Sequence, residues 1–150
     1  MKRKLALTAC LWASGLNIAS AQTLQVIPSQ VLVDEPVAVR ATGLHPNEHV
    51  SIQAELVDGE SHTWASQAEF AADTQGVVDT SNQAPVKGSY SGVSAAGLVW
   101  SMRPTEKHVP SYLPPRDLGP QVIEFGLVRD GRQVANARLE QLRWRAGCNA

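Results

Sequence analysis

The segment at residues 88–92, GSYSG, places two serines between glycines, and serine is the nucleophile of many hydrolases. The nucleophile elbow of α/β-hydrolases, G-x-S-x-G, needs its serine in the middle, on a tight turn between a strand and a helix. Here Tyr90 holds the middle position, with Ser89 and Ser91 on either side. The segment therefore does not have the register of a nucleophile elbow.

A looser match lies at Ser94, which stands between Gly92 and Ala96. The only histidine after it is His108, and Glu106 is the only acid between them, so the α/β-hydrolase order of serine, acid and histidine is formally met. Nothing in the surrounding sequence indicates the parallel sheet and helices that would hold these residues together. We attribute the order to chance and expect no catalytic residue.

Histidine and carboxylate side chains are the other candidates, and the chain has four histidines: His45, His49, His62 and His108. The first two are four residues apart, as in zinc-binding helices, but a Pro-Asn turn between them breaks the helical geometry. We expect solvated loop histidines rather than metal ligands. Asp34 and Glu35 lie at a predicted turn with no sign of a cleft, and we expect them to be solvated. No phosphate loop or dinucleotide fingerprint occurs, so we expect no cofactor.

Residues 1–21 have the three parts of a secretory signal peptide. Basic residues at positions 2–4 come first, an apolar run follows, and Ala19-Ser20-Ala21 has the small-residue pattern of a cleavage site. We predict cleavage between Ala21 and Gln22, with export to the periplasm or outside the cell. The alternative, a lipoprotein cleavage box at Leu7-Thr8-Ala9-Cys10, leaves an apolar region of only about five residues, short of the roughly 7–15 expected.

This cleavage changes the charge of the chain. The sequence has 13 basic and 14 acidic residues, and loss of the three basic residues at the start leaves a net charge of about −4. We therefore expect neither nucleic acid nor, after cleavage, a membrane as partner, since no further apolar run approaches the roughly 18 residues of a spanning helix. Cys148 is the one remaining cysteine, so no disulfide can form within the chain. Two alternatives stay open: Cys148 is an inert thiol, or it forms a disulfide with a second chain.

Apolar residues recur at every second position in five segments, which is the period of a strand with one buried face. The sets are Val37, Val39 and Ala41; Val50, Ile52, Ala54 and Leu56; Trp64, Ala68 and Phe70; Ile123, Phe125 and Leu127; and Ala135, Ala137 and Leu139. Turn residues separate these segments. We predict an all-β fold, an antiparallel β-sandwich of about seven strands.

Three segments can be predicted in more detail. Asp130-Gly131 suits a two-residue type I′ turn, so residues 121–129 and 132–140 should form a β-hairpin. The segment 104–120 contains five prolines and should be irregular, because proline lacks the N–H that a central strand needs. Trp64 is expected in the core. Residues 97–102, GLVWSM, have apolar groups on both faces, which indicates a central strand or one covered by a second domain.

Several runs resemble the start of the acyl-CoA thioester hydrolase and bile acid-CoA:amino acid N-acyltransferase family. They are VDEPVAVRATGLHPNEHVSIQAEL at residues 33–56, TWASQAEFAADTQGVVD at 63–79 and APVKGSYSGVSAAGLVWSM at 84–102. The shared residues include Asp34-Glu35-Pro36-Val37, Trp64 with Ser66, Gly88-Ser89-Tyr90, and Trp100-Ser101-Met102. The resemblance covers roughly residues 24–142, and Val93-Ser94-Ala95-Ala96 departs from the acid and methionine that the family often has there.

The resemblance implies an immunoglobulin-like β-sandwich that is not itself catalytic. In the family an α/β-hydrolase domain follows, with a Ser or Cys nucleophile, Asp and His, and it cleaves or transfers the acyl group of an acyl-CoA thioester. None of those residues can be assigned to this chain. We expect a signal peptide at 1–21, the sandwich at 22–142 and a C-terminal tail at 143–150.

Three hypotheses of function follow from the resemblance. The chain is a non-catalytic family module left without its hydrolase domain by truncation or a frameshift, or a free-standing exported module that binds a separate hydrolase or other partner, or a thiolester hydrolase acting on acyl-CoA in its own right. For the second hypothesis we expect the interface to include Pro85, Gly88, Tyr90, Leu98 and Trp100.

Overall fold

The computed structural model describes residues 21–117 and 119–143; the predicted signal residues before Ala21 and Cys148 in the predicted tail lie outside this range. The described residues form ten strands and one short helix: β1 Thr23–Ile27, β2 Gln30–Leu32, β3 Ala38–Thr42, β4 His49–Val57, β5 Thr63–Ala71, β6 Val78–Asp79, β7 Lys87–Gly88, α1 Gly97–Trp100, β8 Arg103–Pro104, β9 Gln121–Arg129 and β10 Arg132–Leu142. Seven of the strands have three or more residues. The prediction of an all-β fold is confirmed.

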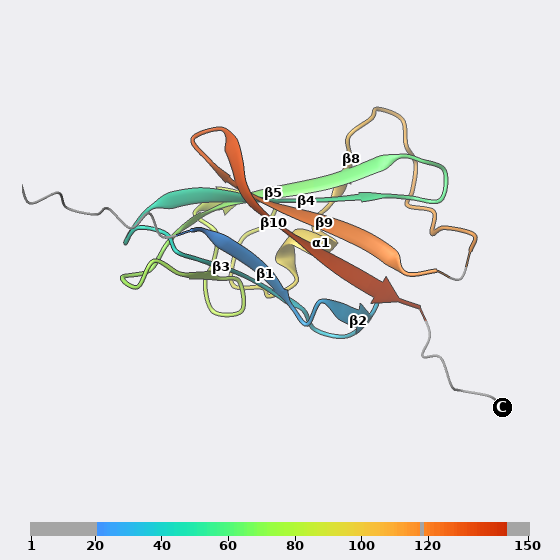
Figure 1. Ribbon diagram of the computed structural model, residues 1–150. Coiled ribbons are helices and arrows are strands. Elements are labelled where there is room, and N and C mark those ends of the chain that lie inside the picture. The colour runs from blue at the N-terminus through green and yellow to red at the C-terminus, as the bar shows by residue number, and fades with distance from the viewer. Residues whose placement is uncertain (1–20, 118, 144–150) are drawn as a thin grey trace, which may run out of the picture.

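The strands form two sheets that face each other (Figure 1). The smaller sheet has the order β1-β3-β6, and the larger has the order β2-β10-β9-β4-β5-β7, with β8 also paired to β5. All pairs are antiparallel except β2 with β10, which is parallel. The first part of the chain thus contributes β1 to one sheet and β2 to the other. The result is the predicted immunoglobulin-like β-sandwich.

The core lies between the sheets and is made by the alternating residues. In β4 the inward residues Val50, Ile52 and Ala54 are buried, and cross-strand neighbours in β5 and β9 continue this face. Phe70 and Phe125 are the largest fully buried side chains. Full burial of such a side chain contributes roughly 1.5–3 kcal/mol, so the inward faces of β5 and β9 contribute substantially to stability. The predicted strand faces are confirmed.

The predicted β9–β10 hairpin is confirmed. Asp130 has φ of 49° and Gly131 has φ of 75°, the two positive angles that a type I′ turn requires. The register shifts once, between Gln133 and Ala135, and then stays regular to the end of β10. Within residues 104–117 and 119–120 of the proline-rich segment, only Pro104 belongs to a strand, as the second residue of β8, and the rest is irregular, as expected.

The predicted central strand at residues 97–102 is wrong, because residues 97–100 form α1. This helix packs against β4 and β5, and Leu98 is buried while Trp100 is largely exposed. Gly97 permits the close packing, since a Cβ atom there would lie 2.3 Å from the ring of Tyr90. Six apolar-rich residues are too few for periodicity to distinguish a strand from a helical turn.

Candidate functional site

At one end of the sandwich the larger sheet extends beyond the smaller one (Figure 1). A partly open cleft lies there. Its volume is about 1230 Å³, above the roughly 300–1,000 Å³ typical of small-molecule sites. The lining residues come from the larger sheet, from α1 and β8, and from two connections: Leu32, Val33, Asp34, Leu56, Trp64, Val99, Trp100, Met102, Arg103, Tyr112, Pro114, Gln121, Gln141 and Arg143. The expectation that no cleft surrounds Asp34 is therefore wrong.

The floor of the cleft is the continuation of the core face of the larger sheet. Leu56 pairs with Trp64 across β4 and β5, and both are only partly buried. Gln121 pairs with Gln141 across β9 and β10. The two glutamines occupy positions that point inward by the strand period, and they stand where apolar residues stand further along the same strands.

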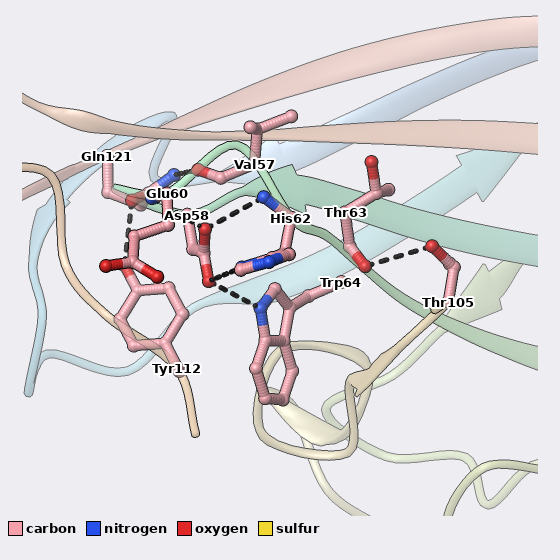
Figure 2. A network of polar contacts seen from close by, with 9 residues as sticks. All are labelled: Val57, Asp58, Glu60, His62, Thr63, Trp64, Thr105, Tyr112 and Gln121. Carbon is pink, nitrogen blue, oxygen red and sulfur yellow. Dashed lines mark hydrogen bonds and ion pairs between the residues drawn. The ribbon is translucent and has the colours of Figure 1, made fainter. Parts of the chain in front are cut away.

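Gln121 is fully engaged in hydrogen bonds (Figure 2). Its amide nitrogen donates to the carbonyl oxygens of Val57, at 3.1 Å, and Val122, at 3.2 Å. Its amide oxygen accepts from the Tyr112 hydroxyl at 2.8 Å. Tyr112 also meets Trp64 edge to face, with ring centroids 5.9 Å apart. These contacts fix the irregular proline-rich segment as one wall of the cleft.

Gln141 differs from its cross-strand partner in its bonding. Its side chain lines the cleft and is as buried as that of Gln121, with exposed fractions of 8% and 7%. Yet within residues 21–117 and 119–143 its amide forms no hydrogen bond. Among the described residues, the one fully buried side-chain polar atom without a partner is the Tyr90 hydroxyl, so the Gln141 amide still reaches the open space of the cleft. The cleft therefore has on its floor one amide without a protein partner.

A second polar group, Asp58, holds the turn between β4 and β5 (Figure 2). Its carboxylate accepts from the backbone N–H groups of Glu60 and His62, both at 2.9 Å, and from the Trp64 indole at 3.1 Å. His62 Nδ1 lies 3.3 Å from the same carboxylate. Burial alone raises the pKa of Asp58, but these hydrogen bonds together outweigh burial and lower the pKa from 3.8 to about 2.

The network around Asp58 is structural in its geometry. All four contacts come from the turn and the start of β5, so they fix the indole of Trp64 at the edge of the cleft. The expectation of a solvated His62 is wrong, because its side chain is only 28% exposed and pairs with Asp58. Local contacts of this kind form because an Asp after a strand can accept from several N–H groups of the following turn.

The opposite wall of the cleft is α1. Trp100 has 59% of its surface exposed, and its indole donates to the Ser94 hydroxyl at 3.0 Å. Its ring also meets that of Tyr90 at 5.8 Å. Tyr90 is buried, which raises its pKa to about 12, and its hydroxyl has no hydrogen-bond partner among the described residues. Ser94 thus acts as a hydrogen-bond acceptor for an indole.

The structure does not bring the predicted interface residues onto one surface. Tyr90 and Leu98 have exposed fractions of 6% and 1%, so their side chains pack inside and cannot offer contact area. Pro85 is partly buried and Gly88 lies exposed in β7. Of the five residues, only Trp100 lines the cleft.

The possible triad is not assembled either. Glu106 and His108 are exposed, and in the described ranges neither contacts Ser94 by a hydrogen bond or ion pair. Ser89 shares a hydrogen bond of 2.7 Å with Ser101. Across residues 21–117 and 119–143, no cluster of three or more His, Cys, Asp or Glu side chains could hold a metal.

Two further predictions concern His49 and membrane-spanning segments. His49 begins β4 and lies 2.9 Å from Glu69, which also pairs with Lys87 at 2.9 Å. His49 and Lys87 together lower the pKa of Glu69. No helix in the described part of the chain is long and apolar enough to cross a membrane.

Trp64 and Trp100 were singled out in the sequence, but four polar residues in or beside the cleft were not: Asp58, Tyr112, Gln121 and Gln141. Gln121 stands two residues before Ile123, and Gln141 two residues after Leu139, so the strand period itself places both glutamines on the core face. A polar residue at an inward position was the available signal. Asp58 and Tyr112 had no comparable signal, since their roles depend on contacts that the fold creates.

The fold and cleft define a β-sandwich module, and comparison with known proteins identifies its family. Residues 34–149 match the acyl-CoA thioester hydrolase/BAAT N-terminal region, and the chain belongs to this family. It is 44% identical over 81 residues to human bile acid-CoA:amino acid N-acyltransferase, covering 54% of this chain and 19% of that protein.

Other relatives show the same partial overlap. Mouse acyl-coenzyme A amino acid N-acyltransferase 1 is 42% identical over 77 residues, covering 51% of this chain and 18% of that protein. Mouse acyl-coenzyme A thioesterase 6 is 33% identical over 85 residues, covering 56% and 20%. The alignments span about a fifth of each relative. The family resemblance expected from the sequence is confirmed.

Proposed function

We propose that this chain is a non-catalytic β-sandwich module of the acyl-CoA thioesterase and acyltransferase family. The match to the family's N-terminal region supports this proposal. The observation that carries it is the use of Ser94, whose hydroxyl accepts a hydrogen bond from the Trp100 indole instead of facing a histidine. A nucleophilic serine needs an adjacent base within hydrogen-bond reach. In this proposal, acyl transfer belongs to an α/β-hydrolase domain distinct from the sandwich.

A turnover assay tests this proposal. Purified protein is mixed with short-, medium- and long-chain acyl-CoA, and thiol release is followed with a thiol reagent, using Cys148→Ser so that the thiol of Cys148 does not add to the signal. We expect the rate with protein to equal the rate in buffer. Protein-dependent release that falls in Ser94→Ala or His108→Ala would contradict the proposal. Arg132→Gln, at the far end of β10, is the matched control.

A second candidate function is that of an exported binding module for a separate hydrolase or other partner. The cleft favours it, because Val33 and Trp100 are large apolar residues that line an open surface and are more than half exposed. The signal-like residues 1–21 also favour it, since acyl-CoA is largely a cytoplasmic metabolite. N-terminal sequencing of the exported protein should begin at Gln22; an unprocessed cytoplasmic chain would count against export.

A further inference from the structure

We propose that the open cleft is a binding site for a small apolar monoanion, a molecule with a slender hydrocarbon body and a single carboxylate or sulfonate group. This goes beyond the proposed function, because it requires no catalysis by the chain and no second protein. Three features of the cleft support it: an amide on the floor that has no protein partner, apolar walls that are already ordered, and an excess of positive charge.

The first feature is the amide of Gln141. It lies on the floor of the cleft, where its polar atoms are not fully buried, and it has no partner in the described part of the chain. The neighbouring Gln121 shows what a satisfied glutamine looks like at the same depth. A ligand with a hydrogen-bonding head group can satisfy the amide of Gln141, whereas a hydrocarbon cannot.

The second feature is the apolar lining. Leu56, Val99 and Met102 supply aliphatic surface, and Trp64 and Trp100 supply flat aromatic surface. Both indoles are fixed by hydrogen bonds, to Asp58 and to Ser94, so they do not need to be ordered when a ligand binds. Walls that are already ordered bind a hydrocarbon body with a smaller loss of entropy.

The third feature is charge. Arg103 and Arg143 line the cleft together with a single acid, Asp34. Each guanidinium group has one hydrogen bond, Arg103 to the Met102 carbonyl at 3.2 Å and Arg143 to the Pro115 carbonyl at 2.7 Å. Neither forms an ion pair within residues 21–117 and 119–143. Arginine has five N–H donors, so most of them stay available to an anion, and charge complementarity selects a monoanion over a cation.

Titration calorimetry with sodium decanoate and with the uncharged analogue decanol tests the inference on the purified protein. We expect saturable one-to-one binding of decanoate and weaker binding of decanol. Arg143→Gln should weaken decanoate binding about tenfold and leave decanol unchanged, since a hydrogen bond to a charged group contributes about that factor. Arg132→Gln, remote from the cleft, should change neither ligand.

Gln141→Leu and Gln141→Glu test the floor. Gln141→Leu should weaken decanoate binding, and Gln141→Glu should weaken it further by repulsion while decanol still binds. Circular dichroism shows whether each variant folds, and a misfolded Gln141→Leu leaves the isosteric Gln141→Glu as the deciding variant. No saturable decanoate binding, or equal affinities for decanoate and decanol in all variants, would overturn the inference. These outcomes are independent of the turnover assay.

Discussion

The two ends of the sandwich are built from the same strands of the larger sheet, but only one end is covered by the smaller sheet. At the closed end both sheets cover the core, and the inward residues Ile52, Phe70 and Leu127 are fully buried. At the open end the larger sheet continues without the smaller one, and its inward positions include Gln121 and Gln141 beside Leu56 and Trp64. The strand period stays constant, and only the residue types change. The strand period therefore determines which side chains point inward, and the presence or absence of the smaller sheet determines whether those side chains form core or cleft.

The largest loss of stability is expected from a substitution in the core of the closed end. Phe125→Ala should lower the free energy of unfolding by about 3–5 kcal/mol, because it leaves a cavity that both sheets line. Urea denaturation measures this. Trp100→Ala, at the open end, is the comparison, and its loss should be several-fold smaller because the side chain is mostly exposed. Equal losses at both positions would remove the distinction between the two ends.

The next effect concerns Asp58 at the edge of the cleft. Its pKa is lowered from 3.8 to about 2, so the ionised form is favoured by folding, and that stabilisation is present above about pH 4 and lost as pH falls toward 2. Asp58→Asn should remove this part of the acid dependence and destabilise the protein at neutral pH. Urea denaturation from pH 6 to pH 2 measures both. Asp117→Asn, an exposed control, should retain the acid dependence.

A smaller effect is expected at Gln121. Gln121→Leu should cost about 1–3 kcal/mol, because the carbonyl of Val57 and the hydroxyl of Tyr112 lose their partner. The same variant should also loosen the proline-rich wall of the cleft. Limited proteolysis measures this, as faster cleavage within residues 105–117. Unchanged stability and unchanged proteolysis would show that Gln121 does not hold the wall.

The smallest effect is expected at Gln141, the cross-strand partner of Gln121. Gln141→Leu should be neutral or slightly stabilising, since it replaces an amide that has no protein partner with an apolar group of similar size. Comparison of the two glutamine variants in the same urea series is the measurement. A loss at Gln141 as large as that at Gln121 would show that the Gln141 amide is satisfied in the folded protein.

Much of the fold could be predicted from the sequence. Alternation in strands such as β4 identified the buried face, and Asp130-Gly131 identified the hairpin, because both depend on local geometry. The segment around α1 was wrongly predicted as a strand, because its short apolar run fits both a strand and a helical turn. Its conformation depends on Tyr90, which lies against Gly97 and leaves no room for a Cβ atom.

The site was harder to predict than the fold. Trp100 is exposed, whereas Tyr90 and Leu98, which were expected on the same interface, are buried. A sequence shows which residues are apolar, and the depth of each one depends on packing between elements. Gln141 is the opposite case, a polar residue at an inward position. Its residue type alone favours the surface, whereas the strand period places it on the inner face of the sheet.

The most direct test of the open end is a nuclear magnetic resonance titration of the purified protein with decanoate. The indole N–H signals of Trp64 and Trp100 report on the cleft, and the backbone amides of Ile52 and Leu127 report on the closed end. The account predicts saturable shifts of both indole signals and of the Gln141 side-chain amide, with the closed end unchanged. Unshifted indoles, or uniform shifts over both ends, would contradict it.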